Sequence, residues 1–125
     1  MARILVIDDE PDIRTILELT LQAAGHEVIL AADGREGVER YCTSPADLVI
    51  TDLYMPNRDG WETIRELRRR FPKVAIIAMS GWVPAGAMLS VAQELGAVGV
   101  LHKPFGAEEL IAIVTRALGG KSSAP

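Results

Sequence analysis

The stretch Leu48-Val49-Ile50-Thr51-Asp52-Leu53-Tyr54-Met55-Pro56 is an apolar run of strand-forming residues that ends on one acidic side chain. Met55-Pro56 then interrupts the run, because proline cannot donate to the hydrogen bonds of a central strand. A short run bounded in this way is typical of a buried strand in a parallel sheet, which is apolar on both faces. We therefore predict that Asp52 stands at the carboxyl end of a central strand, where open α/β sheets place their ligands.

Four other apolar runs have the length and composition of strands, at residues 3–7, 28–31, 74–79 and 97–101. Segments with apolar residues at helical spacing alternate with the strands, at about residues 11–24, 34–43, 60–71, 84–95 and 107–118. This alternation implies a parallel sheet covered by helices on both faces, because crossovers between parallel strands are right-handed. We predict an α/β fold with a doubly wound, five-stranded parallel sheet, flavodoxin-like (βα)5, in strand order 2-1-3-4-5.

The predicted domain occupies residues 1–119, and residues 120–125 are expected to form a flexible tail or the start of a linker. Gly25 is expected to end the first helix, and a turn at residues 57–60 to cap the third. Helical spacing predicts the inward side chains of the first two helices: Ile13, Ile16, Leu17, Thr20, Leu21 and Ala24 in the first, Val38, Tyr41 and Cys42 in the second. Arg14 lies off this stripe and is expected to face solvent.

The length and composition describe one ordinary globular domain. The chain has 125 residues, of which 49% are hydrophobic and 24% are charged, which is sufficient for one core. The formal net charge of −4 argues against general nucleic-acid binding by this domain itself. No apolar run approaches the roughly 20 residues of a membrane span, and the single cysteine cannot form an internal disulfide. These features favour a cytoplasmic protein without membrane contact.

Four of the five predicted strands end in polar or charged groups, which are Asp8-Asp9, Asp52, Ser80 and Lys103. In a parallel sheet these ends lie along one rim. Carboxylates gathered there repel one another and need a cation, and a set of oxygen ligands favours Mg²⁺ or Mn²⁺. Together with an ammonium and a hydroxyl, such an ion forms a receptor for phosphoryl oxygens, with a carboxylate poised to attack phosphorus.

Each of these residues also has an ordinary structural explanation. Asp52 alone is a common type of turn or cap residue, and Asp8-Asp9-Glu10 favours the positive end of the following helix. Ser80 suits a turn, and Lys103 suits a solvated position on the surface. Their shared position at strand ends is what favours a functional interpretation.

These residues resemble the receiver domain of two-component response regulators. The resemblance rests on Ile7-Asp8-Asp9-Glu10, Thr51-Asp52-Leu53-Tyr54-Met55-Pro56, Ser80 and Lys103-Pro104-Phe105, in that order, and it extends over residues 3–118. It implies phosphorelay signalling, in which Asp52 takes a phosphoryl group from a phosphohistidine of a sensor histidine kinase or phosphotransfer protein, or from a small acyl phosphate. Such a domain catalyses at most its own phosphorylation and dephosphorylation, and it switches a surface that binds a downstream output domain or protein.

The resemblance also implies individual roles for the rim residues. Asp9 and Asp52 would ligate Mg²⁺ directly, with the Tyr54 carbonyl as a third ligand and Asp8 acting mainly through water; Mn²⁺ can substitute. Lys103 would contact the phosphoryl oxygens and Ser80 would move toward them as the switch. The peptide bond before Pro104 would be cis, which only a proline makes inexpensive.

The sequence departs from the usual pattern of the family in two ways. The position three residues before Lys103, usually aromatic, is Val100, which is too small to swing between a pocket and solvent. Tyr54 and Trp82 are bulky, and they lie two residues beyond Asp52 and Ser80, where family members border the path of the hydrolytic water.

Two other functional classes remain as alternatives. A haloacid-dehalogenase-like phosphatase also uses an aspartate at a strand end with Mg²⁺, but that chemistry needs a second aspartate where this chain has Tyr54. A phosphorylation-independent interaction module would not need the complete set of acids with Ser80 and Lys103.

Overall fold

The computed structural model describes residues 2–55 and 60–122. Within them five strands form one parallel sheet in the order β2-β1-β3-β4-β5, which confirms the predicted class and strand order. The strands are β1 (Arg3–Ile7), β2 (Glu27–Ala31), β3 (Leu48–Asp52), β4 (Ile76–Ser80) and β5 (Gly99–His102). The helices are α1 (Pro11–Ala23), α2 (Gly34–Thr43), α3 (Gly60–Arg70), the 3-10 turn η1 (Ala85–Ala87), α4 (Met88–Leu95) and α5 (Ala107–Ser122).

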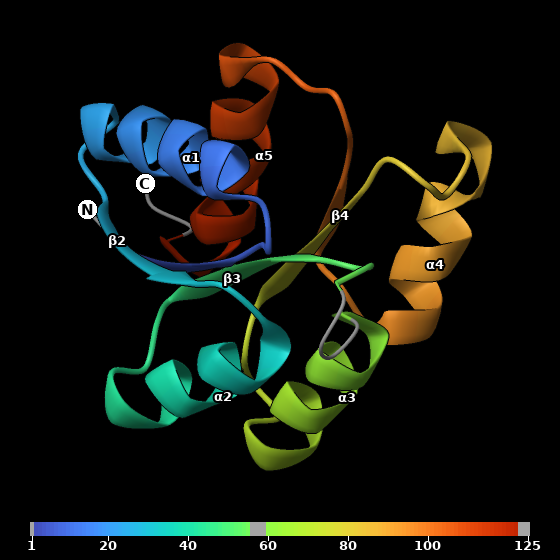
Figure 1. The fold of residues 1–125 in the computed structure, drawn as a ribbon, viewed down its shortest axis with the longest axis horizontal. Coiled ribbons are helices and arrows are strands. Elements are labelled where there is room, and N and C mark those ends of the chain that lie inside the picture. Colours follow the sequence, from blue (N-terminus) through green and yellow to red (C-terminus); the bar gives the residue numbers. More distant parts are fainter. Residues whose placement is uncertain (1, 56–59, 123–125) are drawn as a thin grey trace.

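Helices cover both faces of the sheet, with α1 and α5 on one side and α2 and α3 on the other (Figure 1). One core cluster joins the sheet to α2, α3 and α4 and includes Leu5, Val49 and Ile64. A second cluster joins it to α1 and α5 and includes Val6, Leu17 and Val114. Because β3 lies in the middle of the sheet, all five of its residues are buried. The prediction of a central buried strand that ends in Asp52 is therefore confirmed.

Three side chains predicted to face the core are exposed instead. Ile16 is 55% exposed. The buried face of α1 is narrow and holds only Leu17 and Leu21 fully buried. Cys42 is exposed because it lies at the edge of the buried face of α2, where its Sγ accepts a hydrogen bond from Arg70 Nη2 at 3.3 Å. Ala24 is exposed as well, since α1 ends one residue before it.

Several element boundaries also differ from the prediction. The strand expected to start at residue 74 starts at 76, and the strand expected at 97–101 occupies Gly99–His102. The helix expected from residue 84 begins as the 3-10 turn η1, since no side chain caps α4 at Ala87. The last helix continues through Ser122 instead of ending at residue 118, because glycines lower helix stability without forbidding the helix.

Gly25 has a φ of 95° and follows the end of α1, as predicted. The turn expected at residues 57–60 lies outside the described residues except for Gly60, which begins α3. Among the helices of the described part of the chain, none combines the length and hydropathy needed to cross a bilayer.

Candidate functional site

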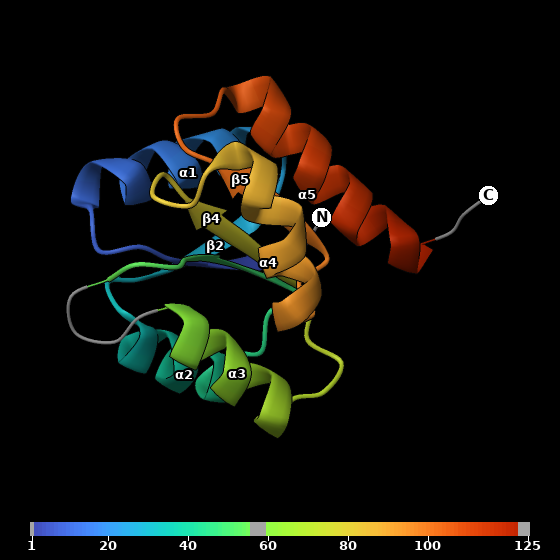
Figure 2. The same ribbon diagram turned by 90° about the vertical axis from the view of Figure 1, so that its right-hand side faces the viewer.

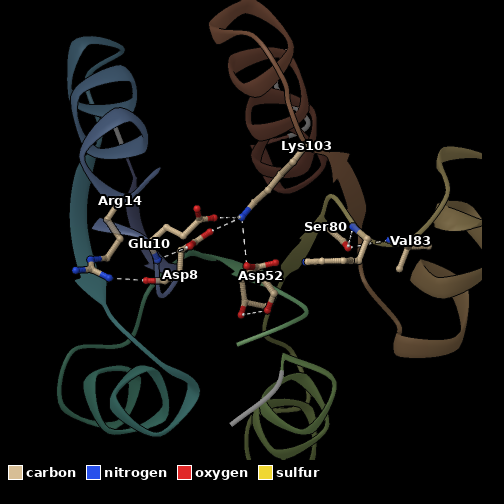
Figure 3. Close-up of polar contacts among 9 residues, drawn as sticks. Asp8, Glu10, Arg14, Asp52, Ser80, Val83 and Lys103 are labelled. Carbon is tan, nitrogen blue, oxygen red and sulfur yellow. Dashed lines mark hydrogen bonds and ion pairs between the residues drawn. The ribbon is translucent and has the colours of Figure 1, made fainter. Parts of the chain in front are cut away.

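The predicted rim residues come together at the carboxyl ends of the strands. Asp8 and Asp9 follow β1, Asp52 ends β3, Ser80 ends β4 and Lys103 follows β5. Figure 3 shows the Lys103 side chain reaching between Asp8 and Asp52, while Ser80 lies farther along the rim. Asp8 and Ser80 are completely buried, and Asp52 is 5% exposed. The sheet topology therefore converts distant sequence positions into one polar cluster.

Lys103 is the cation at the centre of this cluster. Its Nζ lies 2.8 Å from Asp8 Oδ2 and 3.2 Å from Asp52 Oδ2, and 3.5 Å from Glu10 Oε1. The lysine thus bridges the two central carboxylates across strands β1, β3 and β5. Its peptide bond to Pro104 is cis, which confirms the isomer implied by the resemblance.

Burial and the neighbouring charges shift the pKa values of both Asp52 and Lys103. Burial raises the pKa of Asp52, and repulsion from Asp8 acts in the same direction, while attraction to Lys103 opposes both. For Lys103 burial acts to lower the pKa, but its hydrogen bonds and attraction to Asp8 and Asp52 dominate, so the pKa is raised. The cluster therefore holds its proton on the lysine and has negative charge left over for a further cation.

The acidic side chains fit a hard divalent cation. Asp8, Asp9 and Asp52 each offer one carboxylate oxygen, and these oxygens all lie within 4.8 Å of one another. Only oxygen donors are present, as Mg²⁺ prefers. An open cleft of about 510 Å³ reaches two of these aspartates, and its lining is Asp9, Glu10, Asp52, Tyr54, Gly81, Trp82 and Lys103. The Tyr54 residue predicted as a ligand thus borders the same cleft as Asp9 and Asp52.

Ser80 points away from Asp52 in this structure. Its Oγ accepts hydrogen bonds from the backbone N–H groups of Trp82 at 2.9 Å and Val83 at 3.1 Å. Its backbone carbonyl accepts the Lys103 N–H at 2.9 Å. Ser80 is therefore joined to Lys103 through the backbone, and its hydroxyl holds the loop that leads to α4.

Sequence reasoning missed two side chains that support the cluster, one directly before α1 and one in its first turns. Glu10 contributes the third carboxylate beside Lys103, and its backbone N–H donates to Asp8 Oδ1 at 2.9 Å. Arg14 is half-buried rather than solvent-facing, and its Nη1 donates to the Asp8 backbone carbonyl at 2.7 Å. The position of Glu10 directly after the two aspartates weakly indicates a place in the site. Nothing in the sequence indicates such a place for Arg14.

A glycine contact was also missed. The Gly60 N–H donates to the Leu53 carbonyl at 2.7 Å, and a Cβ at Gly60 would overlap the Asp52 carbonyl oxygen. The start of α3 therefore lies directly against the backbone that carries Asp52. A glycine after a turn is common, so the sequence alone did not distinguish this constraint.

A flavodoxin-like sheet with acids and a lysine on its carboxyl rim defines the class of CheY-like α/β domains. The pattern of the response regulator receiver domain matches residues 4–115, and the chain belongs to this family. Receiver domains of two-component systems act in phosphorelay signalling, and this family membership bears out the resemblance drawn from the sequence.

Solved structures agree with this assignment. The chemotaxis protein CheY4 of Vibrio cholerae is 33% identical with a TM-score of 0.87, over 94% of this chain and 99% of that chain. The response regulator TrrA of Thermotoga maritima, solved in complex with Mg²⁺-BeF, is 33% identical with a TM-score of 0.84, over 94% and 100%. NtrX of Brucella abortus, solved with ADP, is 30% identical with a TM-score of 0.88, over 98% of this chain but 28% of that chain. In NtrX the similar domain is therefore one part of a longer protein.

Proposed function

We propose that Asp52 is the phosphoacceptor of a Mg²⁺-dependent receiver domain. The donor is a phosphohistidine on a sensor histidine kinase or phosphotransfer protein, or a small acyl phosphate. The observation that carries the proposal is the Asp52 carboxylate, which ends a buried central strand 3.2 Å from Lys103 Nζ and faces an open acidic cleft. Incubation with acetyl phosphate and Mg²⁺ tests it: intact mass spectrometry is expected to find one added phosphoryl group.

The proposed reaction is a single displacement at phosphorus. An oxygen of the ionised Asp52 attacks the phosphorus atom, and the bond to the donor nitrogen or oxygen breaks with its electron pair leaving on the donor. Lys103 stabilises the negative charge on the phosphoryl oxygens, for which its ammonium has three donors. A bound Mg²⁺ would be held by Asp9, Asp52 and the Tyr54 carbonyl, and Asp8 would act on it mainly through water. The ion would help to neutralise the negative charge of the phosphoryl oxygens.

Asp9→Ala is expected to abolish the thermal stabilisation that Mg²⁺ gives the wild type. Ligand binding to the folded state raises stability in proportion to RT ln(1 + [L]/Kd), and the variant lacks a direct ligand. Without metal the variant is expected to melt at a higher temperature than the wild type, because one of three neighbouring carboxylates is gone. Thermal melts with and without MgCl₂ measure both effects.

Asp12→Ala is the matched control, since Asp12 is an exposed acid on α1 outside the carboxylate cluster. It is expected to keep the wild-type response to Mg²⁺. An Asp9→Ala protein that still responds to Mg²⁺ would show that the proposed ligand set is wrong.

We propose that Ser80 switches by leaving its two backbone donors. Moving its Oγ to the phosphoryl group would free the N–H groups of Trp82 and Val83, and the buried Val83 donor must find a new partner. The loop from Gly81 to Val83 therefore has to rearrange together with the serine. This route needs no aromatic side chain at Val100, which is half-buried against the core.

The side chains of Tyr54 and Trp82 are expected to slow hydrolysis of the phosphoryl group. Both line the cleft over Asp52, although Trp82 is 81% exposed and Tyr54 is 43% exposed. The attacking water must approach in line with the P–O bond. Tyr54→Asn and Trp82→Ala are each expected to accelerate dephosphorylation by about tenfold, which corresponds to about 1.4 kcal/mol in the barrier.

Phosphate release from protein labelled with acetyl phosphate measures these rates after removal of the donor. Equal rates of dephosphorylation in the wild type, Tyr54→Asn and Trp82→Ala would show that Tyr54 and Trp82 do not shield the phosphoryl group from water. In a Trp61→Phe background Trp82 is the only indole, so its fluorescence is expected to change on phosphorylation. An unchanged signal would remove Trp82 from the switch.

The partners proposed for this domain are a kinase or phosphotransfer protein upstream and an output domain or protein downstream. Residues 1–119 form the proposed receiver unit and residues 120–125 the proposed tail or linker; continuation of α5 through Ser122 means that such a linker would begin as a helical extension. The phosphatase alternative gains no support, since Tyr54 offers no carboxylic acid at the required position.

A further inference from the structure

The carboxyl-terminal half of α3 and the three residues after it carry a concentration of cations that the phosphorylation site does not use. Residues 65–73 contain five of the thirteen Lys and Arg residues and one acidic residue, so this segment has a formal charge of +4 and the remainder of the chain −8. Figure 2 shows α3 beneath the sheet, and the helix begins at Gly60, whose N–H donates to the Leu53 carbonyl directly after β3. The cations therefore gather at the end of the molecule opposite the acidic rim.

Three of these cations are available to a partner. Arg65, Arg69 and Lys73 are exposed and make no hydrogen bond or ion pair with any described residue. The other two are engaged, since Arg68 Nη1 donates to the Val74 carbonyl at 3.2 Å and Arg70 pairs with a glutamate one turn earlier at 3.2 Å.

The helix itself does not account for all of these charges. Cations favour the negative carboxyl end of a helix, which explains arginines in the last turn of α3. Arg65 lies earlier and Lys73 lies beyond the helix. Arg65 and Arg69 are four residues apart, a spacing at which like charges repel along a helix. An external anion would offset this repulsion.

A largely apolar hollow lies at the carboxyl end of α3, where Lys73 adjoins it. It has a volume of about 520 Å³, and its lining is Tyr41, Ala46, Asp47, Arg70, Phe71, Pro72, Lys73, Val74 and Ala75. The rings of Tyr41 and Phe71 pack with their centroids 4.6 Å apart. Because Lys73 and its neighbour Pro72 are exposed, the hollow is open and suits a side chain presented by another protein rather than a small molecule that must be enclosed.

We propose that Arg65, Arg69, Lys73 and this hollow form a docking surface, here called the α3 surface, for an acidic protein segment. One large apolar side chain of the segment enters the hollow, and its carboxylates contact the three cations. Arg65 and Arg69 lie about 6 Å apart along α3, which matches the spacing of alternate side chains in an extended peptide, about 6.6 Å. The partner therefore carries acidic residues at alternate positions beside its apolar anchor.

The observations favour protein over nucleic acid as the partner. Three free cations are few for a phosphate backbone, and the chain as a whole is negative, which opposes approach to a polyanion. An acidic peptide needs only a local match of charge and one buried anchor. The α3 surface lies apart from the cleft at Asp52, so this inference does not depend on the proposed phosphorylation.

Binding of labelled peptides to the full chain, followed by fluorescence anisotropy, tests the proposal. The probes are a set of twelve-residue peptides with one Trp, Phe or Leu flanked by glutamates at alternate positions, and counterparts with Glu replaced by Gln or the anchor replaced by Ala. At least one acidic, anchored peptide is expected to bind, more weakly as salt rises. Its two counterparts are expected to lose binding. Backbone amide shifts are expected to change around residues 41–47 and 65–75.

Arg69→Glu/Lys73→Glu is expected to weaken this binding at least about tenfold, because two attractions become repulsions. The matched control is Arg35→Glu/Arg116→Glu, which makes the same charge change at exposed cations elsewhere and is expected to stay within about twofold of the wild type. Thermal melts establish that both variants fold. Failure of every peptide, or equal weakening in both variants, would overturn the proposal; tighter binding of single-stranded DNA with the same dependence on Arg69 and Lys73 would reassign the surface to nucleic acid.

Discussion

Asp52→Asn is expected to take up no phosphoryl group from acetyl phosphate in the presence of Mg²⁺, while the wild type takes up one. A carboxamide lacks the anionic oxygen that attacks phosphorus, and the buried neighbour Asp8 does not offer an equivalent nucleophile. Asp8 is completely buried, with Oδ1 accepting from the Glu10 N–H and Oδ2 bound to Lys103. Both Asp8 carboxylate oxygens are therefore engaged in hydrogen bonds within the protein.

Intact mass and a melting curve of the same sample distinguish this result from unfolding. The metal-free variant is expected to melt at or above the wild-type temperature, because burial and repulsion by Asp8 raise the pKa of Asp52 and asparagine removes that unfavourable charge. Asp12→Asn serves as the control for loss of an exposed acid and is expected to label normally. Full labelling of Asp52→Asn would place the phosphoacceptor at another residue and remove the basis of the proposed function.

The sequence was sufficient to predict the sheet because its strands are short apolar runs with clear ends. β3 is the clearest case: five buried residues end in Asp52. Helical spacing was less informative about burial, since it identifies a stripe but not how wide a face the sheet covers. Ile16 on α1 and Cys42 on α2 therefore proved exposed, although both have apolar neighbours at the expected intervals.

The residues of the candidate site were predictable because they share one topological position, the carboxyl end of a strand. Contacts made by helix residues carry no such signal. Arg14 reaches the Asp8 carbonyl from the first turns of α1, and nothing in its spacing distinguishes it from a solvated arginine. The conformation of Ser80 was likewise unpredictable, since its hydroxyl bonds to local N–H groups in a loop whose path depends on α4.

Gly60 is the residue whose importance only the three-dimensional structure reveals. A Cβ there would overlap the Asp52 carbonyl oxygen and would lie 2.7 Å from Leu53 Cα. These atoms belong to the backbone of a buried strand and its exit, so no side-chain rotation can relieve the overlap. Either α3 or the end of β3 has to move, and the Gly60–Leu53 hydrogen bond of 2.7 Å joins the two.

Gly60→Ala is therefore expected to lower the free energy of unfolding by about 3 kcal/mol, at the upper end of the usual cost of overpacking. It is also expected to slow labelling by acetyl phosphate at least about tenfold, because a displaced Asp52 loses its alignment with Lys103 and the other carboxylates. Urea unfolding measures the first effect, and the rate of mass increase, taken where the variant remains folded, measures the second. Gly86→Ala is the matched control, since a Cβ at Gly86 meets nothing within 4 Å, and it is expected to retain wild-type stability and labelling. If Gly60→Ala were as stable and as active as Gly86→Ala, the close contact between α3 and the Asp52 backbone would impose no constraint on the site.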